Sequence, residues 1–208
     1  FSFGKSSHTK PQLFLYITVG NKLKKMNTIQ SKIIGKLKQD DQIDDWWESE
    51  LIEIPFFNKE KLKIIFTDFV PESDLVNIGE WDNALKLFLE NSDSDRIKLS
   101  HLVYKNCMDF LKMVEFDEAD QHLRKIKNKN KIWDYVQPNE IYISRRPYQD
   151  KDIYVNINCE CDWEQEHGLQ LVFKQGKKIT RISQIDGHLT EADAYDKPDS
   201  EDTLLSQF

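Results

Sequence analysis

The segment at residues 152–162 constrains the fold of this chain most strongly, because its side chains alternate in character from one residue to the next. The first set is apolar: Ile153, Val155, Ile157, Cys159 and Cys161. The second set is Tyr154, Asn156, Asn158, Glu160 and Asp162. A period of two predicts a strand with one buried face. The two cysteines continue the apolar face, so we expect them to be buried as small hydrophobic residues and not to bind zinc.

Other strand-like segments flank this one. Residues 141–143 form a short apolar run, and Leu169, Leu171 and Phe173 alternate with other side chains in the next segment. The triplet Gln175-Gly176-Lys177 predicts a tight turn before a returning strand at residues 179–182. Together these segments predict an antiparallel β-meander over about residues 140–189.

The N-terminal half predicts helices and one hairpin. Apolar residues at helical spacing predict helices at residues 27–38, 78–90 and 96–114. Residues 115–131 begin acidic and become basic, an order that favours a further helix because it complements the helix dipole. Strand-like runs at 51–54 and 62–66 are joined by turn-forming residues and predict a β-hairpin.

The predicted fold class is therefore α+β, with an N-terminal β-hairpin, central helices and a C-terminal antiparallel β-meander packed in one domain. We place this domain at residues 26–189, with its helical part at about 78–136 and its C-terminal sheet at about 140–189. Residues 1–25 hold five lysines and no acidic residue, and we expect them to be a non-native or dispensable extension. Residues 190–208 are acidic, and we expect a mostly disordered tail.

The charge of the chain limits its partners. The formal net charge is −7, and without the five N-terminal lysines the remaining 24 basic side chains face 36 acidic ones. A body this acidic repels phosphate backbones, so we do not expect nucleic-acid binding. A basic protein partner suits it better, since opposite charge accelerates the encounter. The sequence does not define an oligomeric state.

The cysteine count and the hydropathy pattern bear on location. Three cysteines without framework spacing fit a reducing compartment, and no run of 18 apolar residues is present. We therefore expect a cytoplasmic protein that does not insert into a membrane.

Polar residues gather where the strand at 152–162 ends. The first group is Asp162, Trp163, Glu164, Glu166 and His167. Asp186 and His188 follow the last predicted strand. Alternate turns of a meander lie at the same end of the sheet, so the two groups could meet and form one candidate functional cluster.

Three interpretations of this cluster remain open. The histidines could hydrogen-bond the acids and stabilise a turn that also binds a partner. A divalent cation could bind to Asp162, Glu164, Glu166, His167, Asp186 and His188, because carboxylate oxygens suit calcium and magnesium. A hydrolase could use a carboxylate or histidine as general base, with or without a metal-bound water. No serine or cysteine nucleophile and no glycine-rich phosphate loop accompanies the cluster, so we expect no cofactor and favour a non-enzymatic role.

The string Cys-Asp-Trp-Glu-Gln-Glu-His-Gly-Leu-Gln-Leu-Val-Phe at 161–173, followed by Asp-Gly-His-Leu at 186–189, resembles a family of uncharacterised bacterial cytosolic proteins, a domain of unknown function. The resemblance extends from about Trp46 to Leu189. The pattern Trp-x-x-Glu-His-Gly is also similar to parts of immunity-type proteins from bacterial toxin systems. The family has no established catalytic residues. The resemblance implies a bacterial origin and favours an immunity-like binding protein, with a divalent-cation module or metal-dependent hydrolase as the alternative.

Overall fold

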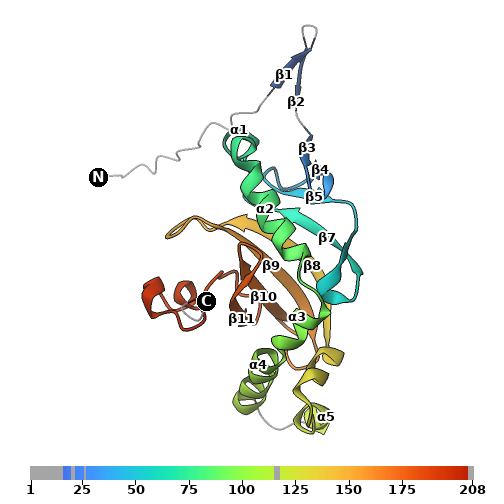
Figure 1. Cartoon of the computed structure of the whole chain (residues 1–208), viewed down its shortest axis with the longest axis vertical. Coiled ribbons are helices and arrows are strands. Elements are labelled where there is room, and N and C mark those ends of the chain that lie inside the picture. Colours follow the sequence, from blue (N-terminus) through green and yellow to red (C-terminus); the bar gives the residue numbers. More distant parts are fainter. Residues whose placement is uncertain (1–15, 20–21, 26, 115–117, 206–208) are drawn as a thin grey trace, which may run out of the picture.

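The computed structural model describes residues 16–19, 22–25, 27–114 and 118–205. Within these residues, nine strands form one mixed sheet in the order β11-β10-β9-β8-β7-β5-β4-β3, and β6 also pairs with β7 (Figure 1). The strands are β3 (Thr28–Ser31), β4 (Gly35–Gln39), β5 (Trp47–Ser49), β6 (Ile52–Ile54), β7 (Glu60–Phe66), β8 (Val136–Arg145), β9 (Ile153–Cys161), β10 (Leu169–Lys174) and β11 (Lys178–Ser183). A separate hairpin joins β1 (Tyr16–Val19) to β2 (Lys22–Lys25).

The pairing of β7 with β8 is parallel, whereas the other strand pairs in the described residues are antiparallel. Two parallel neighbours need a long crossover connection, and here the connection is helical. Its helices are α1 (Pro71–Asp74), η2 (Leu75–Asn77), α2 (Ile78–Leu89), α3 (Asp93–Lys98), α4 (Ser100–Met113), η3 (Glu118–Asp120), α5 (Gln121–Arg124) and η4 (Lys129–Tyr135). Short helices outside the crossover are η1 (Pro55–Phe57), α6 (Glu191–Ala194) and η5 (Asp199–Glu201). None of the helices in the described part of the chain combines the length and apolar character needed to span a bilayer.

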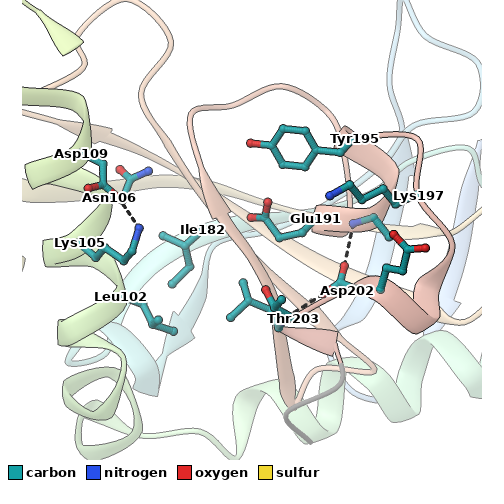
Figure 2. A pocket seen from close by; sticks show the side chains of 13 residues that line it. Leu102, Lys105, Asn106, Asp109, Ile182, Glu191, Tyr195, Lys197, Asp202 and Thr203 are labelled. Atoms are coloured by element: carbon teal, nitrogen blue, oxygen red, sulfur yellow. Dashed lines mark hydrogen bonds and ion pairs between the residues drawn. The ribbon is translucent and has the colours of Figure 1, made fainter. Parts of the chain in front are cut away.

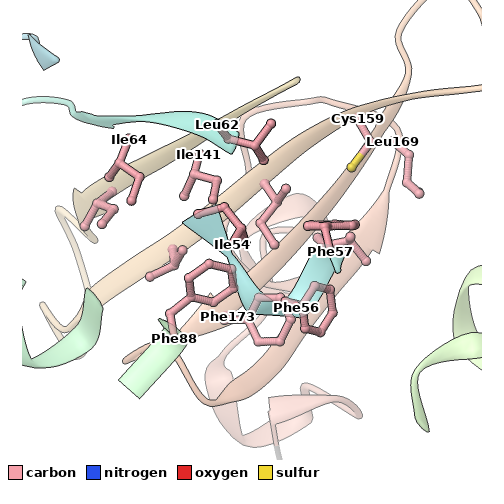
Figure 3. Packing of buried hydrophobic residues seen from close by; sticks show 14 of the residues in the cluster. Ile54, Phe56, Phe57, Leu62, Ile64, Phe88, Ile141, Cys159, Leu169 and Phe173 are labelled. Carbon is pink, nitrogen blue, oxygen red and sulfur yellow. The ribbon is translucent and has the colours of Figure 1, made fainter. Parts of the chain in front are cut away.

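The crossover helices cover one face of the sheet and enclose the core (Figure 1). Phe56, from the turn before β7, packs in this core beside Phe57, Phe88 and Phe173 (Figure 3). The Phe56 ring lies 5.0–6.2 Å, between ring centroids, from the rings of Phe57, Phe88, Trp133 and Phe173. These rings come from the hairpin, α2, η4 and β10, so one aromatic cluster joins both halves of the chain.

The alternation in β9 has the predicted consequence. The apolar set of residues 152–162 is buried, and Cys159 and Cys161 are only 1% and 5% exposed. Burial raises the pKa of Cys161 to about 12, and it raises the pKa of Cys159 as well. Both thiols are therefore protonated core side chains, as the sequence predicts.

The predicted α+β class is confirmed, as are the β6–β7 hairpin, the helix at 78–90 and the C-terminal meander. The helix predicted at residues 27–38 is wrong, because β3 and β4 form a hairpin there. Ser31 explains the difference. Its hydroxyl donates to Asp82 of α2 at 2.5 Å and accepts the N–H groups of Ile33 and Ile34. A long-range contact therefore overrides the helical spacing of the isoleucines.

Two other helix predictions are corrected. The helix predicted at 96–114 is divided at Leu99 into α3 and α4. Within the predicted helix at 115–131, residues 115–117 lie outside the described part, and only α5 is α-helical in the remainder. Arg124 donates to the carbonyl of Leu111 at 2.6 Å, so this segment folds back along α4.

The structure describes only part of the N-terminal 25 residues but most of the C-terminal segment. The expectation that residues 1–25 are dispensable falls largely outside the described residues, apart from β1 and β2. Residues 190–205 form α6 and η5, which differs from the predicted disordered tail. The guanidinium of Arg146 binds the carboxylates of Asp193 and Asp199, so a buried cation gives this acidic segment a fixed position.

Replacing Asp82 with alanine tests the anchor of the β3–β4 hairpin. Asp82 is buried and also accepts the N–H of Lys32 at 3.0 Å. Loss of these charge-assisted hydrogen bonds should lower the free energy of unfolding by about 3 kcal/mol. Denaturant unfolding measures this, with the exposed neighbour Asn83→Ala as control, expected within about 0.5 kcal/mol of wild type. Equal stabilities of the two variants would contradict the assignment.

Candidate functional site at the turn between β9 and β10

The turn at residues 162–168 is organised around Glu164. This residue is 8% exposed, and its carboxylate accepts the backbone N–H groups of Glu166 and His167, each at 3.2 Å. The Gly168 N–H donates to the Glu164 carbonyl at 2.9 Å. His167 places its Nδ1 atom 3.4 Å from the same carboxylate. Glu164 therefore closes the turn, as in the structural interpretation of the cluster.

Trp163 ties this turn to the helical layer. Its ring is buried, and its indole N–H donates to the Asn106 side chain of α4 at 3.0 Å. On the opposite side of the turn, the Cys161 thiol lies 3.6 Å from the Glu164 carbonyl. Trp163 is thus part of the core and not an exposed platform for a ligand.

The exposed carboxylates of the corner surround a surface groove of about 420 Å³. Residues on the groove include Gln137, Asn139, Glu160, Asp162, Glu164, Glu166, His167 and Ile185. Four of these carry carboxylates, and no lysine or arginine occurs among the described residues that line the groove. Glu160 and Glu166 are exposed, while the Asp162 side chain, 44% exposed, lies 3.7 Å from His122. The groove therefore offers negatively charged hydrogen-bond acceptors, and no lysine or arginine among its described lining residues pairs with them.

Asp186 and His188 do not line the groove. Ile185 reaches the groove, so the two turns do lie at the same end of the sheet. The Asp186 carboxylate, however, binds the Arg181 guanidinium and accepts the Gln170 side-chain amide at 2.7 Å. Burial acts to raise the pKa of Asp186, but the hydrogen bonds from Arg181 and the His188 N–H outweigh it and hold the pKa below its ordinary value.

The predicted cluster is therefore only partly assembled. Glu164 and His167 are in contact, whereas Asp186 pairs with Arg181 and His188 is exposed. Nowhere in the described ranges do three or more histidine, cysteine, aspartate or glutamate side chains form a group suited to a metal ion. The six residues proposed as metal ligands are thus not gathered around one point.

Several residues that contact the site lie far from the turn in sequence, so the sequence of the turn does not predict them. Asn106 and His122 belong to the crossover and contact Trp163 and Asp162. Asn139 of β8 donates a hydrogen bond of 3.3 Å to the Glu160 carboxylate. Gln137 reaches the groove because it pairs with Glu160 across β8 and β9. Only the strand register places these residues at the corner, and the local sequence carries no signal for it.

The fold and the corner define an α+β domain with an acidic surface groove. The family described as a domain of unknown function, DUF6985, matches residues 33–189. The chain therefore belongs to this family, as its resemblance to an uncharacterised family predicts. No curated protein and no solved structure shows significant similarity to the chain.

Replacing Gly168 with alanine tests how tightly the turn is fixed. Gly168 has a φ of +68°, and a Cβ atom there would lie 2.5 Å from the Cys159 carbonyl oxygen. Gly187 also has positive φ, at +77°, but a Cβ atom would meet nothing within 4 Å. In each alanine variant, the left-handed backbone at the substituted position should cost about 1 kcal/mol. Gly168→Ala should lose about 1–3 kcal/mol more from overpacking.

Denaturant unfolding of the two glycine variants gives this difference directly, because Gly187→Ala controls for the left-handed backbone. Equal losses in both variants would show that the turn has room to relax away from β9.

Proposed function

We propose that the protein is a non-enzymatic binding module that holds a basic segment of a protein partner in the acidic groove beside β9 and β10. The observation that carries this proposal is the presence of three exposed carboxylates, those of Glu160, Asp162 and Glu166, in one surface groove. Within the described part of the chain, no lysine or arginine lines this groove, so its carboxylates attract such a side chain from a partner. The net charge of −7 adds a long-range attraction.

The burial of the carboxylate and the thiols that could act in catalysis supports binding over catalysis. The Glu164 carboxylate is buried and accepts two backbone N–H groups, so little of it is accessible to a substrate. The thiols nearest the groove belong to Cys159 and Cys161, which are buried and have raised pKa values. The exposed groups, Glu160 and Glu166, are suited to charge pairing with a partner.

The partner chemistry agrees with an immunity-like role. The similarity of the Trp-x-x-Glu-His-Gly pattern to immunity-type proteins favours a bacterial, cytoplasmic setting, in which a basic toxin would be the natural ligand. A rigid corner is useful for such a role, because fixed carboxylates lose little conformational entropy on binding. Trp163 and Glu164 supply this rigidity through their contacts with Asn106 and the turn backbone.

Charge reversal of the groove tests the proposal. The variant Glu160→Lys/Glu166→Lys should bind a synthetic arginine-rich peptide about ten- to a hundredfold more weakly than wild type at low salt. Fluorescence anisotropy with a labelled peptide measures the affinity. The matched control is Glu50→Lys/Glu53→Lys, which makes the same change in net charge at exposed positions outside the groove, one after β5 and one on β6.

The control variant should retain most of the affinity. Equal losses in both variants would mean that the peptide responds only to total charge, and the proposed groove would be abandoned. A rise in melting temperature with calcium or magnesium that is lost in Glu160→Lys/Glu166→Lys would instead support the cation-binding alternative.

A further inference from the structure

Two buried arginines contact the C-terminal segment, and neither of them lines the acidic groove. Arg146 follows β8 and Arg181 lies within β11, and their side chains are 2% and 6% exposed. Within residues 33–189, the part matched by the family, Arg146 contacts Asp150 at 3.2 Å and Arg181 binds Asp186. A buried guanidinium requires compensating acceptors, so the surroundings of these two cations decide their stability.

The remaining acceptors come from residues 190–205, the C-terminal segment beyond the family match. The Asp199 carboxylate accepts hydrogen bonds from both terminal nitrogens of Arg146, at 2.7 and 2.9 Å, so the pair is bidentate. Asp193 binds the same guanidinium at 2.6 Å. Glu191 lies 3.1 Å from Arg181. The C-terminal segment thus covers both arginines with three carboxylates.

The geometry is that of an acidic peptide recognised by an arginine cluster. A bidentate arginine–carboxylate pair fixes both position and direction, and several such pairs give selectivity for an acidic sequence. Tyr154 completes the site, because its ring lies 5.9 Å beneath the Arg146 guanidinium. Arg181 and Tyr154 belong to the sheet and Arg146 directly follows β8, whereas the acids that the arginines hold belong to a short segment with few turns of helix.

The C-terminal segment is anchored by the buried residues Thr190, Ala192 and Asp202, but part of it borders open space. A cavity of about 460 Å³ separates it from α4, and Figure 2 shows side chains of α4 on one side and of the segment on the other. Leu102 and Ile182 face this space from the domain, and Tyr195 of the segment is 66% exposed. The ion pairs with the arginines therefore supply the charge-specific part of the attachment.

From these contacts we infer that Arg146 and Arg181 form a docking site for an acidic segment of a protein partner, which the chain's own residues 190–205 occupy. This site is separate from the acidic groove and selects the opposite charge, so it goes beyond the proposed function. The tethered segment has an effective concentration on the order of millimolar, which excludes weak competitors. A partner segment gains access when the contacts of Asp193 and Asp199 are weakened.

A peptide with the sequence of residues 190–205 is the probe. The full-length variant Asp193→Asn/Asp199→Asn retains the tether but has lost the two carboxylates that bind Arg146. Fluorescence anisotropy should show that the labelled peptide binds this variant at least about tenfold more tightly than wild type. A peptide carrying Asp193→Asn/Asp199→Asn should lose at least about tenfold in affinity. The matched control peptide carries Asp196→Asn/Glu201→Gln, which removes the same charge at exposed positions and should bind like the unmodified peptide.

Two results would overturn the inference. One is equal affinity of the peptide for the variant and for wild type, and the other is an equal loss for both modified peptides. If the full-length variant does not fold, hydrogen–deuterium exchange on wild type decides. Excess peptide should accelerate exchange at Ala192 and Leu204, whose N–H groups donate to Asp202. Unchanged exchange at a peptide concentration on the order of 10 mM, above the effective concentration of the tether, would exclude a displaceable segment.

Discussion

The parallel pairing of β7 with β8 is the constraint on which the other parts of the domain depend. It joins an N-terminal antiparallel unit to the C-terminal meander, with Ile64 opposite Ile141 and Phe66 opposite Ile143. Because parallel neighbours need a crossover, residues 67–135 must pass across the sheet, and they supply the helical layer. That layer buries the apolar face of β9 and leaves the polar side chains of β9 on the opposite face.

The candidate site follows from the same arrangement. Where β9 leaves the covered sheet, Trp163 reaches α4 through Asn106 and Glu164 closes the turn, so the chain direction is fixed at the corner. The carboxylates of Glu160, Asp162 and Glu166 beyond these anchors are exposed and line a groove. At the β11 edge the charges are reversed, since buried arginines are covered by acidic residues of the C-terminal segment. The domain therefore combines an exposed acidic groove with buried arginines that its own C-terminal acids cover.

The sequence predicted those parts of the structure that depend on local pattern. The alternation of β9 gave the burial of Cys159 and Cys161, and helical spacing gave α2. Local pattern could not predict the β3–β4 hairpin, because the Asp82 carboxylate that binds Ser31 lies 51 positions away in the sequence. For the site, the corner residues were visible, but their partners were not. The sequence made Asp186 a candidate ligand, whereas its carboxylate binds Arg181 and Gln170 in the structure. The position of residues 190–205 depends in part on their ion pairs with Arg146.

Chemical-shift mapping of the isotope-labelled full-length protein with an arginine-rich peptide tests the central claim, that the acidic groove is a protein-binding surface, most directly. The account predicts saturable shifts concentrated at residues 160–168, Ile185 and Gln137, which line the groove, with little change near Arg146 and Arg181. It also predicts that added salt reduces these shifts, since screening weakens exposed charge pairs. Shifts spread evenly over all acidic surfaces, or their absence from residues 160–168, would contradict it.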